Sequence, residues 1–308
     1  MRRLRFPAAA AVLCCAAVAA GCGLGPGSDT GSAEMSITRD YGSAELAGSF
    51  DFDATESDTV LRVLDSHEDI TTRYGGRFVQ SIDGVSGDET GGRRYDWFFY
   101  VNGVESPQGS ADVKVHGGDR IWWDFRDWTA AMRVPAVVGS YPEPFKHGFE
   151  GHDYSTRIEC AGTTPPCEAA RRSLESNGVK ADVSGSDPGG GPALRVIVGT
   201  WDAVGKDHAA ALIDQGPAVS GVFARFEDGK LVLLDAQGRP SERFGVGAGL
   251  VAAVRDGDGP PTWVLTGTDK AGVAAAVALF NRDDLEDHCA VAATPSVAPE
   301  ALPLIPGS

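Results

Sequence analysis

Apolar and polar residues alternate with a period of two where the folded part of the chain is expected to begin. Met35 to Tyr41 (MSITRDY) has the pattern of a β-strand, and Leu46 to Phe52 follows as its expected hairpin partner. Thr55 to Asp58 then offers capping and acidic side chains, which suit the start of a helix. The apolar residues at 60, 61, 63 and 64 have helical spacing. A hairpin followed by one helix is therefore predicted.

Three further apolar segments of strand length follow this helix, at residues 77–85, 95–101 and 118–125. Asn102-Gly103 comes directly after the second segment. It is a strong hairpin signal because both residues tolerate a positive φ. We therefore predict an α+β domain over residues 34–134, in which one helix crosses a sheet.

Strands alternate with helices in the second half of the chain, which predicts an α/β domain over residues 146–294. The strand patterns lie at 156–160, 194–201, 222–235, 249–256 and 261–268, and the helical patterns at 167–179, 206–213 and 270–280. Residues 135–145 hold three prolines, which favour extended backbone, and are predicted to link the two domains. Residues 295–308 form a proline-rich tail.

Two strand ends in this second domain resemble each other. Val198-Gly199-Thr200 and Thr266-Gly267-Thr268 each end a predicted strand and precede a helix. Such ends lie on one edge of an α/β sheet, where ligands often bind. The preferred interpretation is simpler, because tight turns need glycine in any case.

The first 21 residues have the features of a secretory signal, with a basic start and an apolar run from Ala8 to Ala20. A helix of 13 residues is about 20 Å long. That is too short for a hydrocarbon core of about 30 Å. A permanent transmembrane anchor is therefore not expected.

The end of this segment, Ala19-Ala20-Gly21-Cys22, resembles the lipobox of bacterial lipoproteins, although Ala19 stands where leucine is usual. The resemblance implies that Cys22 carries a diacylglycerol and anchors the mature protein on the extracytoplasmic face of the cell membrane. The alternative is an ordinary cleaved signal. Residues 22–33 are rich in glycine and serine and are predicted to be a flexible tether.

The chain is acidic, with a formal charge of −16 that becomes −19 when the signal and its three arginines are removed. Nucleic-acid binding is not expected, because the chain would repel phosphates. The sequence has no basic amphipathic stretch, so membrane contact is expected through the lipid anchor only.

Three cysteines remain beyond the signal and Cys22, and export makes a disulfide plausible. Cys160 and Cys167 flank a loop with two prolines that would bring them together, and this pairing is favoured. The alternative joins Cys160 to Cys289, which would staple the start of the second domain to its end.

Several motifs of the first domain resemble the β-grasp domain at the C-terminus of transcobalamin and intrinsic factor, and the bacterial family of domain of unknown function 4430. They are Thr59-Val60-Leu61, Ser81 to Gly84, Trp97 to Gly103 and Gly118 to Trp123. The resemblance covers about a third of the chain. It implies a β-grasp fold and a corrinoid ligand.

One departure from those carriers concerns the second half of their binding site. Their ligand lies between the β-grasp domain and an α/α barrel, and this chain has no helical repeats. A separate helical-barrel protein or a membrane transporter is therefore an expected partner.

Aromatic residues are dense in the first domain, and adjacent ones must face opposite sides of the sheet. One face is expected to be exposed to a flat ligand, unless the second domain covers it. The predicted ligand-binding residues are Trp97, Tyr100, Asn102, Trp122, Trp123 and Trp128. Asn102 would contribute an amide at a hairpin tip, although its turn-forming role alone explains it.

No established catalytic motif occurs, including the nucleophile elbow, the P-loop and the zinc-protease helix. His147, His152 and Asp153 cluster, as do Asp256 and Asp258, but polar loops explain both clusters better than a metal does. No cofactor is expected. We expect a non-enzymatic lipoprotein of an uptake system; the alternatives are a protein-interaction module of the cell envelope and a hydrolase with an unrecognised site.

Overall fold

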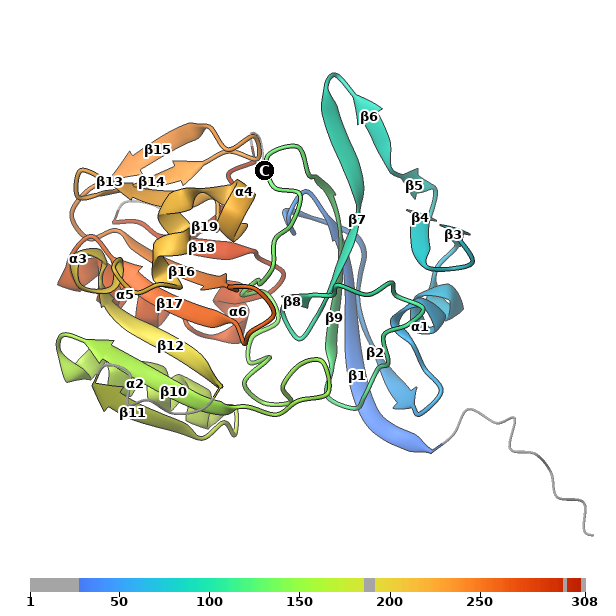
Figure 1. Ribbon diagram of the computed structural model, residues 1–308, viewed down its shortest axis with the longest axis horizontal. Helices are drawn as coiled ribbons and strands as arrows, with labels where there is room; N and C mark the ends of the chain where they lie inside the picture. The colour runs from blue at the N-terminus through green and yellow to red at the C-terminus, as the bar shows by residue number, and fades with distance from the viewer. Residues whose placement is uncertain (1–27, 186–191, 296–297, 306–308) are drawn as a thin grey trace, which may run out of the picture.

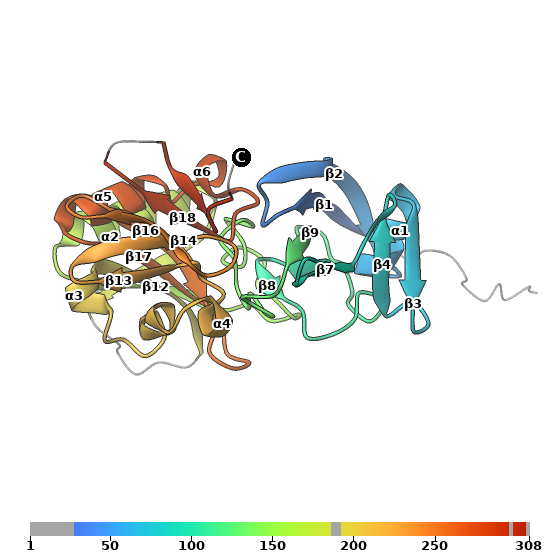
Figure 2. The same ribbon diagram turned by 90° about the horizontal axis from the view of Figure 1, so that it is seen from above.

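The computed structural model describes residues 28–185, 192–295 and 298–305. The fold is α+β and contains two large sheets that lie side by side (Figures 1 and 2). The predicted signal peptide and Cys22 lie outside the described residues. Among the residues described, no helix combines the length and the apolar character needed to cross a membrane.

The N-terminal sheet has the strand order β2-β1-β9-β7-β6, and β8 pairs with β7. Its strands are β1 (Asp29–Arg39), β2 (Ala44–Thr55), β6 (Asp88–Thr90), β7 (Arg93–Val101), β8 (Val104–Glu105) and β9 (Arg120–Asp127). β1 and β2 form the predicted hairpin, whereas β1 and β9 run parallel. A small sheet of β3 (Ile70–Arg73), β4 (Phe78–Ile82) and β5 (Val85–Ser86) flanks the large one. The β-grasp assignment of this half stays a prediction.

Helix α1 (Val60–His67) covers the outer face of the N-terminal sheet. The Thr59 side chain caps it by accepting a hydrogen bond from the backbone N–H of Arg62. The helix buries Val60, Val63 and Leu64 in a core that includes Met35, Ile37, Ile121 and Trp123 of the sheet.

The predicted tether and tail are shorter than the sequence suggested. β1 begins at Asp29, inside the predicted tether, because residues 29–33 continue the pairing with β2. β19 (Glu300–Leu302) lies inside the predicted tail, where it pairs with β18 and buries Leu302. Both segments lack a strong apolar pattern of their own, and their partner strands hold them in the sheets.

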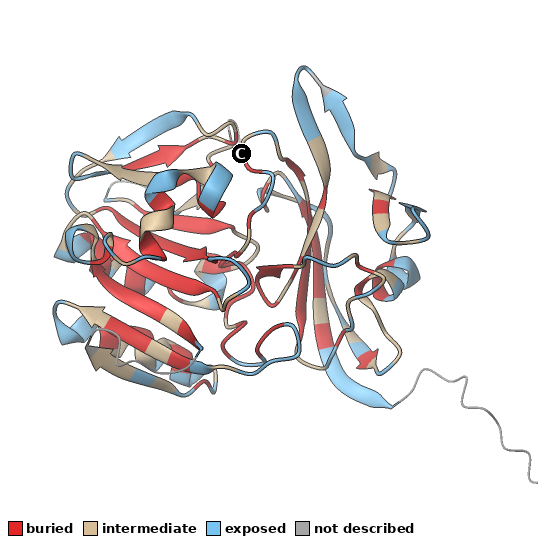
Figure 3. Cartoon of the chain, in the orientation of Figure 1, coloured by how far each residue is buried: buried red, intermediate tan, exposed pale blue. Residues whose placement is uncertain are grey.

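The C-terminal sheet has the strand order β11-β10-β12-β17-β16-β18-β19. Its strands are β10 (Ser155–Ala161), β11 (Ala181–Gly185), β12 (Ala193–Thr200), β16 (Gly249–Val254), β17 (Thr262–Gly267), β18 (Ala290–Ala293) and β19. The first four strands in the order are parallel, and β16 is antiparallel to β17. Every residue of β16 and β17 is buried (Figure 3), which is typical of strands covered on both faces.

Helices and a small sheet cover the two faces of the C-terminal sheet. On one face lie α2 (Thr164–Ser176) and α5 (Lys270–Ala278), with α6 (Arg282–Leu285) nearby. On the other lie α3 (Trp201–Val204), η1 (Ala210–Gln215), α4 (Pro217–Ser220), and the small sheet of β13 (Ala224–Glu227), β14 (Lys230–Leu234) and β15 (Pro240–Phe244). The helix expected over residues 206–213 is a 3₁₀ helix and begins later, at Ala210.

Residues 135–145 lie between β9 and β10 and do not form an open linker. Ala136, Val137, Val138 and Tyr141 are each at most 2% exposed. The prolines keep this segment from becoming a helix, and its apolar side chains fill the space between the sheets. The two halves therefore meet through a packed segment.

Candidate functional site

The structure does not place the predicted aromatic residues on an exposed surface. Trp97 and Trp123 lie in the core under α1, and Tyr100 and Trp122 lie in the core shared with the C-terminal half. Each of the four is at most 6% exposed. The prediction of an exposed aromatic face is therefore wrong, and the alternative, that the second half covers that face, is what the burial shows.

Neighbouring side chains hold Trp122 in place on the face of the sheet that packs against the C-terminal half. Its indole N–H donates a 2.8 Å hydrogen bond to the Thr38 hydroxyl, and its ring stacks on Tyr100 at 5.1 Å between centroids. Thr38 in turn donates to the Asp124 carboxylate. Burial raises the pKa of Asp124 to about 6. These hydrogen bonds hold Trp122 within the core, and they explain its position without a ligand.

Trp128 differs from these four, because it is only half-buried. The Arg94 guanidinium lies 3.9 Å from the centre of its ring. This cation–π contact explains its position without a ligand.

Asn102 lies at the tip of the β7–β8 hairpin with a φ of 53°, as the turn signal predicted. Its amide nitrogen donates to the Asp119 carboxylate and to the Gly148 carbonyl, and its oxygen accepts from the backbone N–H of Arg120. The amide is buried and fully bonded. Asn102 therefore shapes the site and leaves no free donor for a ligand.

A cleft of about 670 Å³ lies beside this hairpin. We call it the hairpin cleft. Residues between 101 and 119 form one wall, and residues between 147 and 153 form the other. Val101, Val104, Val113 and Phe149 supply apolar surface, and polar side chains lie among them. Small-molecule sites commonly have this size and this mixture.

The charge in the hairpin cleft is mostly negative. Its lining includes the carboxylates of Asp112, Asp119, Glu150 and Asp153, against the ammonium of Lys114. Lys114 donates to a backbone carbonyl outside the cleft.

Three of these four carboxylates have partners, including Asp112, which pairs with Arg77 at 3.5 Å. Asp119 accepts from Asn102 and from the backbone N–H of His116, and Glu150 pairs with Arg255 at 3.2 Å. The side chains of Gln108 and Asp153 form no hydrogen bond or ion pair with the described part of the chain. They are the polar groups most available to a ligand.

His147 closes one end of the cleft. Its Nδ1 atom lies 2.7 Å from a carboxylate oxygen of Glu143, and its backbone N–H donates to the other oxygen. Burial raises the pKa of Glu143, whereas the bonds from His147 oppose that shift. The partner of His147 is therefore a buried carboxylate. Among residues 28–185, 192–295 and 298–305, no group of three His, Cys, Asp or Glu side chains could hold a metal ion.

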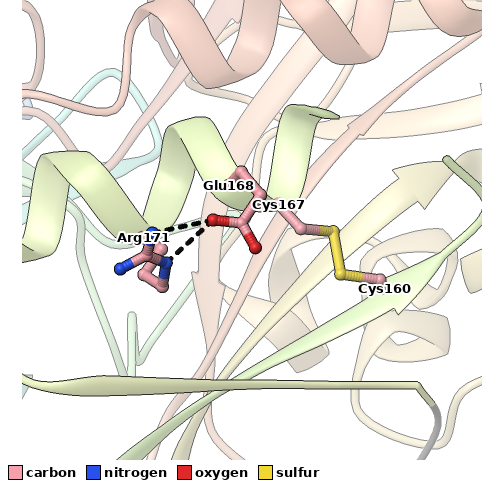
Figure 4. Close-up of a disulfide and its surroundings, with 4 residues drawn as sticks. All are labelled: Cys160, Cys167, Glu168 and Arg171. Atoms are coloured by element: carbon pink, nitrogen blue, oxygen red, sulfur yellow. Dashed lines mark hydrogen bonds and ion pairs between the residues drawn. A yellow bond between two sulfur atoms is a disulfide. The ribbon is translucent and has the colours of Figure 1, made fainter. Parts of the chain in front are cut away.

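The Sγ atoms of Cys160 and Cys167 are bonded, at 2.14 Å. This is the pairing that the sequence favoured, and Cys289 is a buried free thiol. The bridge joins the end of β10 to the first turn of α2, close to an ion pair between Glu168 and Arg171 (Figure 4).

Sequence reasoning missed most of the hairpin cleft. Ser106, Gln108, His116 and Phe149 lie in turns and loops, where neither strand nor helix periodicity marks them. The one available signal was the cluster of polar residues after the linker, which was assigned to a solvated loop.

Residues 57–127 match the model of a family described as a domain of unknown function (DUF4430). The match covers less than half of the chain, runs from just before α1 to the end of β9, and includes one wall of the hairpin cleft. No curated protein matches the chain.

One similar solved structure is a protein from Ruminococcus gnavus ATCC 29149 that is provisionally described as metal binding. The two are 17% identical, with a TM-score of 0.26. The likeness covers 32% of this chain and 97% of that one. At this score it carries no argument about the fold or the activity of this chain.

Proposed function

We propose that the protein is an extracytoplasmic lipoprotein, anchored through Cys22, that binds a small ligand in the hairpin cleft and catalyses no reaction. The observation that carries the proposal is the cleft itself. It has an apolar lining and free polar groups at Gln108 and Asp153, and one of its walls lies on the segment that matches the family. These features suit binding, because the apolar surface supplies affinity and a few polar groups supply orientation.

The charge of the hairpin cleft limits the class of ligand. Asp112 and Glu150 are each paired with an arginine, which leaves the carboxylates of Asp119 and Asp153 against Lys114. This balance favours a neutral or cationic molecule over an anion. A corrinoid is the class we favour, on the resemblance of the first domain to the transcobalamin β-grasp domain. A corrinoid is much larger than a drug-sized molecule, so a cleft of about 670 Å³ would enclose only part of it. A second protein, either a helical barrel or a membrane transporter, would then cover the rest.

Equilibrium dialysis of the purified mature chain against cobalamin tests the ligand class. We expect weak binding by the chain alone and tighter binding with a covering partner. Dialysis is preferred to tryptophan fluorescence, because no tryptophan lines the cleft.

Gln108→Trp tests the location of the ligand. Gln108 is exposed and lines the cleft, so a large ring there fills the space and should weaken binding at least about tenfold, or about 1.4 kcal/mol. Gln215→Trp is the matched control, because Gln215 is exposed in η1 and does not line the cleft. Equal cobalamin affinity in both variants would exclude the hairpin cleft as the site. No binding at millimolar cobalamin, with or without a candidate partner, would favour the envelope-interaction module instead.

The anchor is tested separately by Cys22→Ala. The variant should appear in the medium or accumulate as uncut precursor, because the lipid has no acceptor. Fractionation with membranes like the parent would show that the anchor lies elsewhere.

A further inference from the structure

A second cavity, of about 380 Å³, lies at the carboxyl edge of the C-terminal sheet. We call it the switch-point pocket. Its lining comes from the loop after β10, the loop after β12 and the start of α5. It shares no lining residue with the hairpin cleft.

The topology of the sheet opens this pocket. β10 and β12 are adjacent and parallel. The chain leaves β10 into α2 on one face of the sheet, and it leaves β12 into α3 and η1 on the other. The two connections diverge, so a crevice remains between the strand ends. Open α/β sheets bind their ligands in this crevice, outside the carboxyl ends of the strands.

Most of the pocket wall is apolar. Ala161, Pro166, Val198, Ala203 and Val273 contribute side chains to it. A ligand that fits this wall needs an apolar body, and a volume of about 380 Å³ lies at the small end of the range for ligand pockets.

Three polar side chains that line the pocket form no hydrogen bond or ion pair within the described part of the chain. Thr163 and Thr200 stand at the N-cap positions of α2 and α3, and neither hydroxyl makes the capping hydrogen bond usual there. Lys270 is the one charged residue that lines the pocket, and its ammonium has no hydrogen bond or ion pair with the described residues. Each group is therefore free to bond a ligand.

Lys270 is the first residue of α5 and follows Asp269, whose carboxylate caps the helix by accepting from the backbone N–H groups of Ala271 and Gly272. Lys270 forms no ion pair with this carboxylate or with any other described residue, so its ammonium can pair with an anion in the pocket. The disulfide between Cys160 and Cys167 also holds the loop after β10 in place, so the pocket is preformed (Figure 4).

We propose that the switch-point pocket binds a small organic carboxylate, with its apolar body against Val198 and Val273. The carboxylate pairs with Lys270 and accepts hydrogen bonds from Thr163 and Thr200. The site is independent of the hairpin cleft, and its charge selects the opposite class of ligand.

Isothermal titration calorimetry of the mature chain tests this with three probes of equal length: hexanoate, hexan-1-ol and hexylamine. Hexanoate should bind most tightly. Lys270 is exposed, so its pairing with a carboxylate is partly screened by solvent. Lys270→Gln should weaken hexanoate about three- to fivefold and leave the affinity for hexan-1-ol unchanged. Lys206→Gln is the matched control, since Lys206 is exposed and does not line the pocket.

Two further variants locate the probe. Ala203→Trp should abolish hexanoate binding by filling the pocket, and Thr200→Val should weaken it while keeping the shape of the side chain. Circular dichroism and the melting temperature confirm folding, and Lys270, being exposed, carries the test if Ala203→Trp does not fold. The proposal is overturned if hexanoate gives no binding heat at about 50 mM. It is equally overturned if hexylamine binds as well as hexanoate, or if Lys270→Gln binds hexanoate like Lys206→Gln.

Discussion

Replacing Trp122 by alanine tests whether the two halves share one core. Trp122 belongs to the N-terminal sheet and is 2% exposed. The core around it includes Val137 from the connecting segment and Phe223 and Leu250 from the C-terminal half. If this arrangement holds, loss of the indole removes contacts that stabilise both sheets.

The expected cost comes from two sources. Truncating a buried tryptophan to alanine costs about 3–5 kcal/mol, because the transfer free energy is lost and a cavity remains. The hydrogen bond to the Thr38 hydroxyl, worth about 0.5–1.5 kcal/mol, is lost as well. Together they predict a decrease of about 3.5–6.5 kcal/mol in the free energy of unfolding. Domains commonly have a total of about 5–15 kcal/mol, so the variant should be marginally folded.

Urea unfolding followed by far-ultraviolet circular dichroism measures this change. Trp128→Ala is the matched control, because Trp128 is half-buried and has the Arg94 guanidinium against its ring. Its loss should cost about 0.5–1 kcal/mol. The parent should also resist limited proteolysis within residues 135–145, and Trp122→Ala should become sensitive there.

Two results would refute the shared core. One is a loss for Trp122→Ala no larger than that for Trp128→Ala. The other is a split transition in which the C-terminal half unfolds at the same urea concentration as in the parent. The second result would restore the two independent domains that the sequence suggested.

Three further predictions concern stability. Burial raises the pKa of Asp287 to about 6, whereas the usual value in unfolded chains is near 4. The folded state therefore disfavours the charged carboxylate, and the free energy of unfolding falls as the pH rises from about 4 to 6. Asp287→Asn should therefore be more stable than the parent by about 3 kcal/mol at pH 8 and close to it near pH 4, by urea unfolding at both values. A constant difference would contradict the buried acid. Asp269 accepts backbone hydrogen bonds at the start of α5, and these bonds lower its pKa. The charged carboxylate therefore stabilises the fold at neutral pH, and this stabilisation is lost as the pH falls through the lowered pKa. Asp269→Ala should cost about 1–2 kcal/mol at pH 7 in the same assay, and no change would exclude the cap. Replacing both Cys160 and Cys167 by alanine should lower the free energy of unfolding by about 2–3 kcal/mol, because the unfolded chain is no longer constrained by the closed loop. If the parent unfolds identically with and without reductant, the bridge is absent.

Local patterns in the sequence predicted most strands and helices, because each element carries its own signal. The alternation in β7 and β9 correctly divided their aromatic residues between two faces. It could not say what covers the second face, since that depends on how the two halves meet. The answer lay in residues 135–145, where three prolines indicated a linker but valine and tyrosine side chains fill a core.

The two cavities also differ in whether a local sequence signal or a long-range contact forms them. The switch-point pocket lies at the strand end Val198-Gly199-Thr200. The sequence marked this end and Thr266-Gly267-Thr268 as a possible ligand edge, although tight turns that need glycine were the preferred interpretation. That strand end carries a local signal, and parallel pairing brings it beside the end of β10. No local sequence signal marks the hairpin cleft. Its walls meet because the Asn102 amide bonds the Gly148 carbonyl, 46 residues away. A hairpin-tip asparagine looks the same in a sequence whether it faces a ligand or joins two loops. A cavity made by strand ends is therefore open to prediction from one sequence, whereas a cavity made by loops depends on contacts that only the folded chain defines.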